Sequence, residues 1–157
     1  MARSNRQLTQ FAVNKINQYL EAGPISFRSE KQGNTEVCFY KCPESACLLR
    51  SLRVKLFGEL ICSLVLSPVN PLITSGVVLF GGNFYDSKGR PSRTTRERLN
   101  GILDILGERG VIPSGLRAFI NPSTGECCIG KGDQCRPLSN NTDKVVILAN
   151  PDELVFS

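Results

Sequence analysis

The sequence has 157 residues, of which 41% are hydrophobic and 21% charged, a composition typical of one globular domain and unlike that of a disordered or fibrous chain. Nineteen Lys and Arg against fourteen Asp and Glu give a net charge of +5, which favours anionic partners but is small for a dedicated nucleic-acid coat. No apolar run approaches the roughly 20 residues of a membrane span, and the N-terminus lacks an apolar signal core, so we expect a cytoplasmic protein.

The first third of the chain predicts a helix followed by a hairpin. Apolar residues recur at three- and four-residue spacing across residues 5–22, and Gly23-Pro24 ends this pattern. Residues 25–30 and 36–41 are short β-prone runs, and the Gly-Asn pair between them suits a hairpin turn.

The middle of the chain predicts the strands of the main sheet. Residues 48–66 alternate in polarity at first and are mostly apolar later, which indicates two strands that bend at Phe57-Gly58. After a Pro-containing loop, residues 72–80 predict a further strand, which ends in Gly81-Gly82.

The last part predicts a second helix, a second hairpin and a closing strand. The helix begins at a Ser92 cap and runs to Leu106. Residues 116–121 and 126–131 flank a strong turn signal and therefore predict a hairpin, and residues 144–149 predict the final strand.

Mixed element order with abundant hairpins favours an α+β fold: a small, largely antiparallel sheet with two main helices packed against it. We expect one domain over residues 1–157. Its N-terminal helix lies within residues 1–24, the sheet occupies 25–138 with the helix at 92–107, and a linker and closing strand fill 139–157.

The start of the second helix carries unexpected positive charge. Residues 88–98 hold five basic side chains and one acid, including Arg93 and Arg96, although the positive end of a helix dipole prefers acids. Guanidinium groups, the hydroxyls of Thr94 and Thr95 and free helix amides together bind phosphate well. We therefore predict an anion site here; the alternative is a solvated basic face with Ser92 as a simple cap.

Neighbouring residues extend this candidate site. Gly81-Gly82 permits close approach of a ligand to the backbone, and Phe84 and Tyr85 offer rings for stacking on a base, unless the glycines form an ordinary turn and Phe84 is core. The amide of Asn100 can read a ribose hydroxyl or a base edge, and Arg117 is a similar candidate, but either can be a plain surface residue.

Catalysis and metal binding are not expected. The chain has no histidine, which excludes triads with a histidine base and histidine-ligated zinc, and it has neither a phosphate-binding loop nor a dinucleotide glycine fingerprint. The seven cysteines are expected to be free thiols, because an odd count in a cytoplasmic chain is poor evidence for a disulfide framework. A zinc site is disfavoured because their spacing does not make two Cys-x-x-Cys knuckles. We predict no catalytic residues, no metal and no cofactor.

The run Ser-Arg-Thr-Thr-Arg-Glu-Arg-Leu-Asn from Ser92, followed by a helix and a hairpin beginning at Leu116-Arg117, resembles small phage proteins. It is most similar to anti-Thoeris proteins of the first type, sponges that sequester cyclic ADP-ribose signals made by bacterial TIR-domain enzymes. The resemblance covers residues 77–130. It implies ligand contacts at Phe84, Asn100 and Arg117, although the loop 86–91 is longer than the family leads us to expect and could move the ring of Phe84 away.

The resemblance further implies binding without turnover by a homo-oligomer with pockets at subunit contacts, and a second site for cyclic oligonucleotides in some members. Three functions follow as hypotheses. The first is a sponge for a phosphate-bearing cyclic nucleotide signal, which would block bacterial anti-phage defence from the host cytoplasm. The second is a nucleic-acid-binding module that uses the basic segment 88–98. The third is a phage inhibitor that acts by protein–protein contact.

Overall fold

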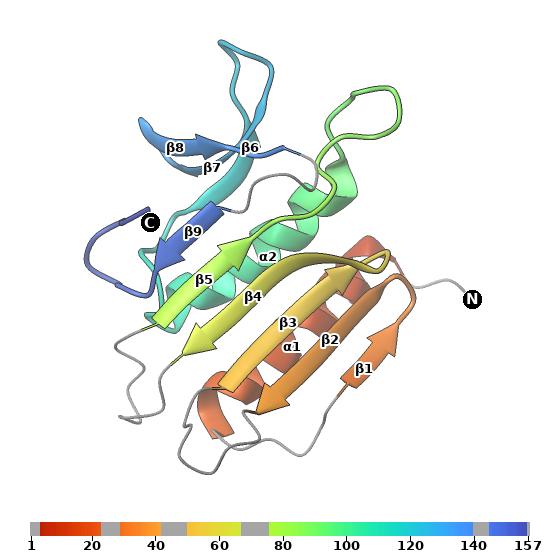
Figure 1. Cartoon of the computed structure of the whole chain (residues 1–157), viewed down its shortest axis with the longest axis vertical. Helices are drawn as coiled ribbons and strands as arrows, with labels where there is room; N and C mark the ends of the chain where they lie inside the picture. Colours follow the sequence, from red (N-terminus) through yellow and green to blue (C-terminus); the bar gives the residue numbers. More distant parts are fainter. Residues whose placement is uncertain (1–3, 23–28, 42–49, 67–75, 140–144, 157) are drawn as a thin grey trace.

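The computed structural model describes residues 4–22, 29–41, 50–66, 76–139 and 145–156. These residues form two helices, α1 (Asn5–Ala22) and α2 (Arg93–Glu108), and two antiparallel sheets. The strands are β1 (Ser29–Gln32), β2 (Thr35–Lys41), β3 (Arg50–Leu56), β4 (Glu59–Leu66), β5 (Gly76–Phe80), β6 (Arg117–Ile120), β7 (Cys127–Lys131), β8 (Gln134–Pro137) and β9 (Val145–Leu148). The predicted α+β fold class is confirmed (Figure 1).

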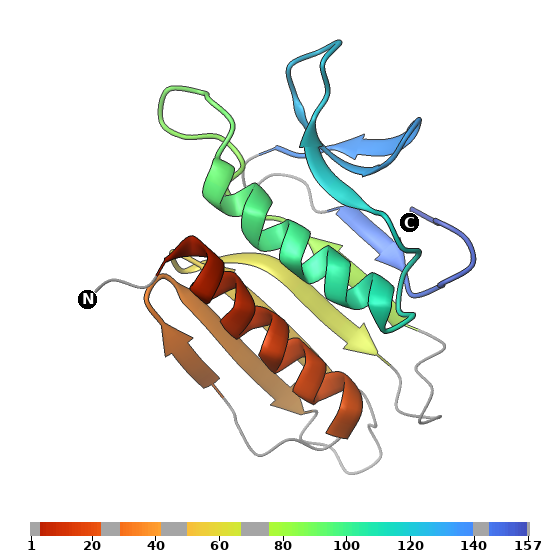
Figure 2. The same ribbon diagram turned by 180° about the vertical axis from the view of Figure 1, so that it is seen from behind.

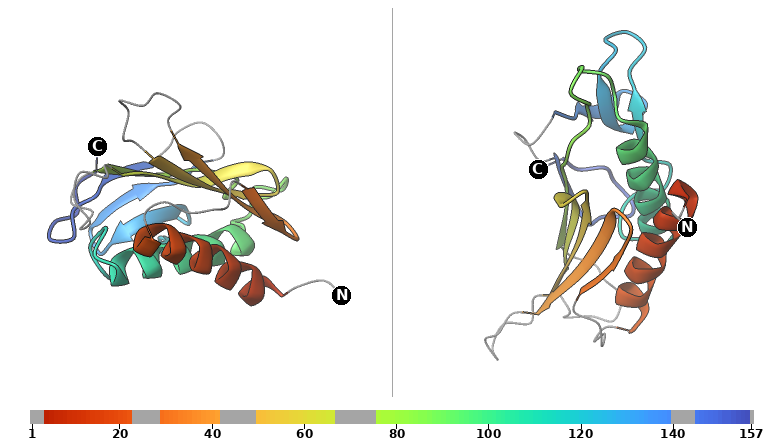
Figure 3. Two further views of the ribbon diagram at one scale, coloured as in Figure 1. Left: turned by 90° about the horizontal axis from the view of Figure 1, so that it is seen from below. Right: turned by 90° about the vertical axis from the view of Figure 1, so that its right-hand side faces the viewer.

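The main sheet has the strand order β1-β2-β3-β4-β5-β9, with every neighbouring pair antiparallel. Both helices lie against the same face of this sheet, as the views from behind and from below show (Figures 2 and 3). Because α1 and α2 also pack against each other, they form one helical layer over the sheet.

The apolar stripe predicted for α1 points into the core. Phe11, Ala12 and Ile16 are buried, and they join one hydrophobic cluster with Leu52 of β3 and Leu99 of α2. In β3, buried residues alternate with more exposed neighbours, as in a strand covered on one face, whereas in β4 the residues 61–64 are all buried. No helix among the described residues is long and apolar enough to cross a membrane.

The bend predicted at Phe57-Gly58 is the tight turn between β3 and β4. Phe57 and Gly58 have positive φ angles of 52° and 80°. The Phe57 N–H donates to the carbonyl oxygen of Asn34 at 2.8 Å, which ties this turn to the turn between β1 and β2. Glycine adopts this conformation without cost, whereas a phenylalanine there is strained.

The second hairpin, β6–β7, is present as predicted, but it gains a third strand that the sequence did not predict. β8 pairs antiparallel with β7, and the three strands form a separate small sheet beside α2. The closing strand β9 joins the main sheet next to β5. Residues 25–28, 48–49 and 72–75 of the predicted strands, and residues 140–144 of the predicted linker and start of the closing strand, lie outside the described part of the chain.

Candidate ligand-binding site

The loop that enters α2 is organised by Asp86. Its carboxylate accepts hydrogen bonds from the backbone N–H groups of Lys88 and Arg90, each at 2.9 Å, and from the Arg90 Nε at 3.2 Å. The backbone N–H of Arg90 above all, with further help from Lys88 and the Arg90 charge, lowers the pKa of Asp86. The carboxylate therefore stays ionised at neutral pH and holds the loop closed around itself.

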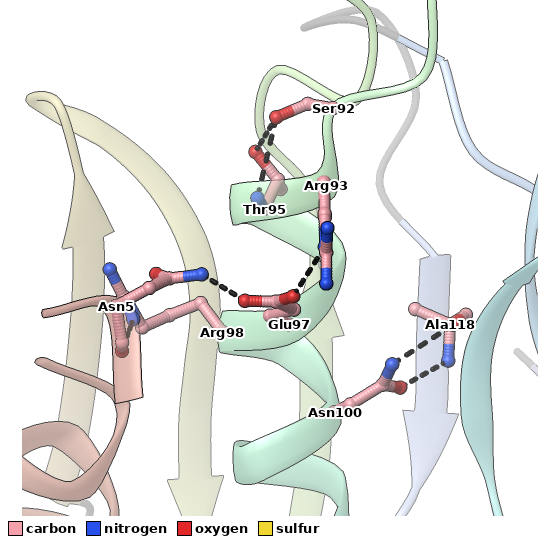
Figure 4. A network of polar contacts seen from close by, with 8 residues as sticks. All are labelled: Asn5, Ser92, Arg93, Thr95, Glu97, Arg98, Asn100 and Ala118. Carbon is pink, nitrogen blue, oxygen red and sulfur yellow. Dashed lines mark hydrogen bonds and ion pairs between the residues drawn. The ribbon is translucent and has the colours of Figure 1, made fainter. Parts of the chain in front are cut away.

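The helix begins where the sequence predicted. Ser92 is the N-cap residue, with φ −78° and ψ 114°, and its Oγ accepts from the Thr95 N–H at 3.4 Å. Thr95 is buried, and its hydroxyl donates to the carbonyl oxygen of Asn83 at 2.8 Å (Figure 4 shows its contact with Ser92). The Thr95 hydroxyl predicted to hold a phosphate therefore fastens the loop to the helix.

A cavity of about 470 Å³ opens beside this helix start. Its walls come from the β3–β4 hairpin on one side and from the loop and first turn of α2 on the other: Leu56, Phe57, Ile61, Asn83, Tyr85, Asp86, Ser87, Ser92 and Thr95. We call it the Phe57 pocket. Its volume lies within the range of small-molecule sites, and its mixture of apolar walls and a few hydroxyls is typical of them.

Phe84, the predicted stacking residue, lies in the core, and Phe57 lines the pocket in its place. Phe84 is fully buried in the hydrophobic core, so its ring cannot stack on a ligand, and the prediction for it is wrong. Phe57 lines the pocket and is 70% exposed, although the sequence around it predicts only a bend. An aromatic directly before a turn glycine was the signal that could have identified it.

The glycine pair serves the fold. An added Cβ on Gly82, whose φ is 114°, would lie 2.7 Å from the Cγ2 of Ile61, and the Gly81 N–H donates to the Ile61 carbonyl oxygen at 3.0 Å. The space beside the glycine backbone that was predicted for a ligand is thus filled by the Ile61 side chain. It sets the loop against β4, and so brings the two walls of the pocket together.

The predicted cluster of arginines does not converge on the pocket. Arg93 is exposed and paired with Glu97 at 2.8 Å, and Arg90 is paired with Asp86. Arg98 is fully buried on the side of α2 that faces α1, where it donates to the Asn5 carbonyl oxygen at 2.8 Å (Figure 4). These three cations stabilise the local structure.

Arg96 is the exception. It is half-buried, its Nε is inaccessible and without a partner, and within the described residues its guanidinium forms no ion pair. Its charge opposes the pKa increase that burial causes at Cys127, which places it on the β7 side of the helix. Among the arginines of the helix start, Arg96 is therefore the one whose side chain forms neither an ion pair nor a hydrogen bond within the described residues.

The first turn of α2 also leaves donors free. The backbone N–H groups of Arg93 and Thr94 have no acceptor among the described residues, and the first turn contains no acidic side chain. Thr94 is half-buried and does not line the pocket. The positive end of the helix dipole is thus uncompensated beside Ser92, as in helix termini that bind phosphate.

Asn100 and Arg117, both predicted ligand contacts, do not line the Phe57 pocket and are engaged in contacts within the chain. Asn100 donates to the Ala118 carbonyl oxygen at 3.1 Å and accepts from the Ala118 N–H at 2.7 Å, which fixes β6 to α2 (Figure 4). Arg117 donates to both carboxylate oxygens of Asp104 at 3.0 and 3.1 Å. Both side chains are occupied by contacts between elements.

Tyr85 is a predicted site residue that does line the pocket. Its phenolic oxygen accepts a hydrogen bond from the Cys127 N–H at 2.8 Å, so the ring is held between the pocket and β7.

No family model, curated protein or solved structure matches the chain. Among the described residues, no group of three or more Cys, Asp or Glu side chains is placed to hold a metal ion.

Proposed function

We propose that the chain is a non-catalytic binding protein that sequesters a phosphate-bearing nucleotide-type ligand in the Phe57 pocket. The observation that carries the proposal is the cavity itself: an exposed aromatic ring forms one wall, and a helix start with unused N–H donors adjoins the other. These are the two kinds of surface that a nucleotide needs, one for the base and one for the phosphate.

In this proposal, different parts of the pocket bind the base and the phosphate of the ligand. The Phe57 ring stacks on the base, and the hydroxyls of Ser87 and Ser92 with the free N–H groups of α2 bind the phosphate. Arg96 in the first turns of α2, although it does not line the pocket, adds a positive charge that no ion pair neutralises within the described residues. A sponge must reach nanomolar affinity, about −12 kcal/mol, which requires several charge-assisted hydrogen bonds in addition to stacking.

The proposed ligand follows from the resemblance of segment 92–100 and the hairpin after it to anti-Thoeris proteins of the first type. On that basis the ligand is a cyclic ADP-ribose isomer or a cyclic oligonucleotide, the working form is a homo-oligomer, and the effect is to block bacterial anti-phage defence.

Isothermal titration calorimetry with cyclic ADP-ribose isomers and cyclic di- and trinucleotides tests the proposal. We expect one of these ligands to bind the unmodified protein with nanomolar affinity and to be recovered intact by mass analysis. Phe57→Asn should weaken binding at least tenfold, because asparagine accepts the positive φ but provides no ring. Phe57→Tyr keeps the ring and should retain binding.

The outcomes separate the alternatives. No heat with any of these ligands, or recovery of a hydrolysed product, contradicts the proposal. Affinity for single-stranded or duplex oligonucleotides that falls steeply with salt would favour the nucleic-acid hypothesis. Equal affinity for Phe57→Asn and Phe57→Tyr would place the ligand outside the Phe57 pocket.

A further inference from the structure

Two cysteines lie on neighbouring strands of the small sheet, away from the Phe57 pocket. In the β7–β8 register, Cys128 is opposite Pro137 and Gly130 is opposite Cys135. Residues two apart on a strand point to the same face, so the two cysteines occupy one face on diagonal positions. Cys127, by contrast, points to the opposite face and joins the hydrophobic core.

The register that brings these cysteines together is fixed by a short turn. Lys131 pairs with Gln134, which leaves only Gly132 and Asp133 to connect β7 and β8, and Gly132 has a φ of 59°. A two-residue hairpin with glycine at its first position allows very little slippage. The diagonal placement of Cys128 and Cys135 is therefore a consequence of the turn.

The two strands also approach unusually closely where Cys135 lies. Gly130 has a φ of 150°, and a Cβ added to it would lie 2.6 Å from the Cys135 Cα and 2.9 Å from the Cys135 Cβ. No other residue type fits at position 130 without moving β8 away. The glycine thus keeps β8 close to β7 at Cys135, which lies diagonally opposite Cys128.

The two thiols share one face of the small sheet and differ in exposure. Burial, followed by the neighbouring Cys135 thiol and its hydrogen bond, raises the pKa of Cys128. Cys128 is buried, whereas Cys135 is half-buried and reachable from solvent. An oxidant would therefore meet Cys135 first and find Cys128 beside it.

We propose that Cys128 and Cys135 are an oxidisable pair, which a peroxide converts to a disulfide that links β8 to β7. The Cys135 thiolate attacks one oxygen of the peroxide, so an S–O bond forms, the O–O bond breaks, and water leaves once protonated. The Cys128 thiol then attacks the sulfenic sulfur, an S–S bond forms, the S–O bond breaks, and a second water leaves. The two thiols supply the two electrons that reduce the peroxide.

The Cys128–Cys135 disulfide would stabilise mainly β8. It closes only the short loop between Cys128 and Cys135, so it constrains the unfolded chain less than a disulfide across a long loop would. β8 is an edge strand of four residues that pairs only with β7 among the described strands. The disulfide should therefore slow hydrogen exchange at the β8 amides and leave the main sheet unaffected.

Treatment of the folded protein with hydrogen peroxide, followed by non-reducing peptide mapping, tests this inference. We expect a Cys128–Cys135 linked peptide that dithiothreitol reverses, and slower exchange of the Gln134 and Arg136 amides in the oxidised protein. Cys135→Ser and Cys128→Ser should each abolish the linked peptide. Cys38→Ser, which changes a buried thiol on β2, should leave it intact.

The result is independent of the proposed ligand, because the pair lies outside the Phe57 pocket. The inference is overturned if peroxide leaves both thiols free, if it carries Cys135 to the sulfinic acid without a linked peptide, or if the linked peptide forms only in urea. A linked peptide without slower exchange in β8 would contradict the proposed local effect.

Discussion

At the scale of single residues, burial assigns the roles that the sequence left open. Phe57 directly precedes Gly58 and Phe84 lies two residues after Gly82, yet Phe84 is fully buried and Phe57 is 70% exposed. Arg96 and Arg98 are two positions apart on α2 and therefore face different sides of the helix. Only the tertiary packing shows which member of each pair is available to a ligand.

Arg98 is the clearest case of a cation that stabilises the fold. It donates to the Asn5 carbonyl oxygen, to the Thr9 Oγ1 at 2.5 Å and to the Asn34 Oδ1 at 3.2 Å, which joins α1, α2 and the β1–β2 turn. Its acceptors are neutral, and burial lowers the pKa of Arg98 because it disfavours the charged form. The stabilisation comes from these three hydrogen bonds.

Replacement of Arg98 by methionine should lower the free energy of unfolding by about 2 kcal/mol or more, because buried acceptors on three elements lose their donor. Urea denaturation measures this change. Arg93→Met is the matched control on the same helix; its exposed pair with Glu97 should contribute less than about 1 kcal/mol. Unchanged or increased stability in Arg98→Met would show that the cost of burying the charge exceeds the gain from its hydrogen bonds.

At the scale of elements, α2 is the part that connects the two sheets. It packs against α1 and the main sheet, and it reaches the small sheet through the paired hydrogen bonds between Asn100 and Ala118. Arg117 and Asp104 add an exposed ion pair at the same contact. The side chains predicted to bind a ligand on this flank of the helix instead position β6.

Asn100→Ala should therefore lower the free energy of unfolding by about 1–3 kcal/mol, because the N–H and carbonyl of Ala118 lose their partners. Ligand affinity in the Phe57 pocket should not change. Asn100→Asp, which keeps the acceptor for the Ala118 N–H, should lose less stability. A large loss of affinity in Asn100→Ala with unchanged stability would instead restore Asn100 as a ligand contact.

The elements differ in how far their sequences predict them. α1 and α2 follow from apolar periodicity, and the β1–β2 and β6–β7 hairpins follow from their turn residues. β8 contains glutamine, cysteine, arginine and proline, without the β-branched residues that mark a strand, and it forms because β7 provides a partner. The position of β9 beside β5 depends on pairing across many residues, which local patterns do not contain.

The candidate site was predictable only in part, for the same reason. The Ser92 cap and the uncompensated helix start are local features and were predicted from local sequence. The other wall of the pocket belongs to the β3–β4 turn, which is distant in sequence and is brought near by the pairing of β4 with β5 and the close packing at Gly82. Residues that come together only through sheet pairing have no characteristic spacing in the sequence, so no motif reveals that they form one site.

At the scale of the whole molecule, a helical layer on a six-stranded sheet provides a rigid frame with the Phe57 pocket at one end of α2. The pocket walls come from elements on both layers, so a bound ligand would bridge them. The small sheet fixes Tyr85 of the pocket wall through the hydrogen bond from the Cys127 N–H to its phenolic oxygen. We therefore expect the ligand to fill a site that exists before binding.

The most direct test of the central claim is native mass spectrometry of the protein purified from bacteria in which TIR-domain signalling is active. We predict that the unmodified protein and Phe57→Tyr carry an added mass equal to an intact cyclic nucleotide, which denaturation releases, and that Phe57→Asn carries none. Protein that emerges from these cells with no added mass, or that carries the same mass in Phe57→Asn, would contradict the account.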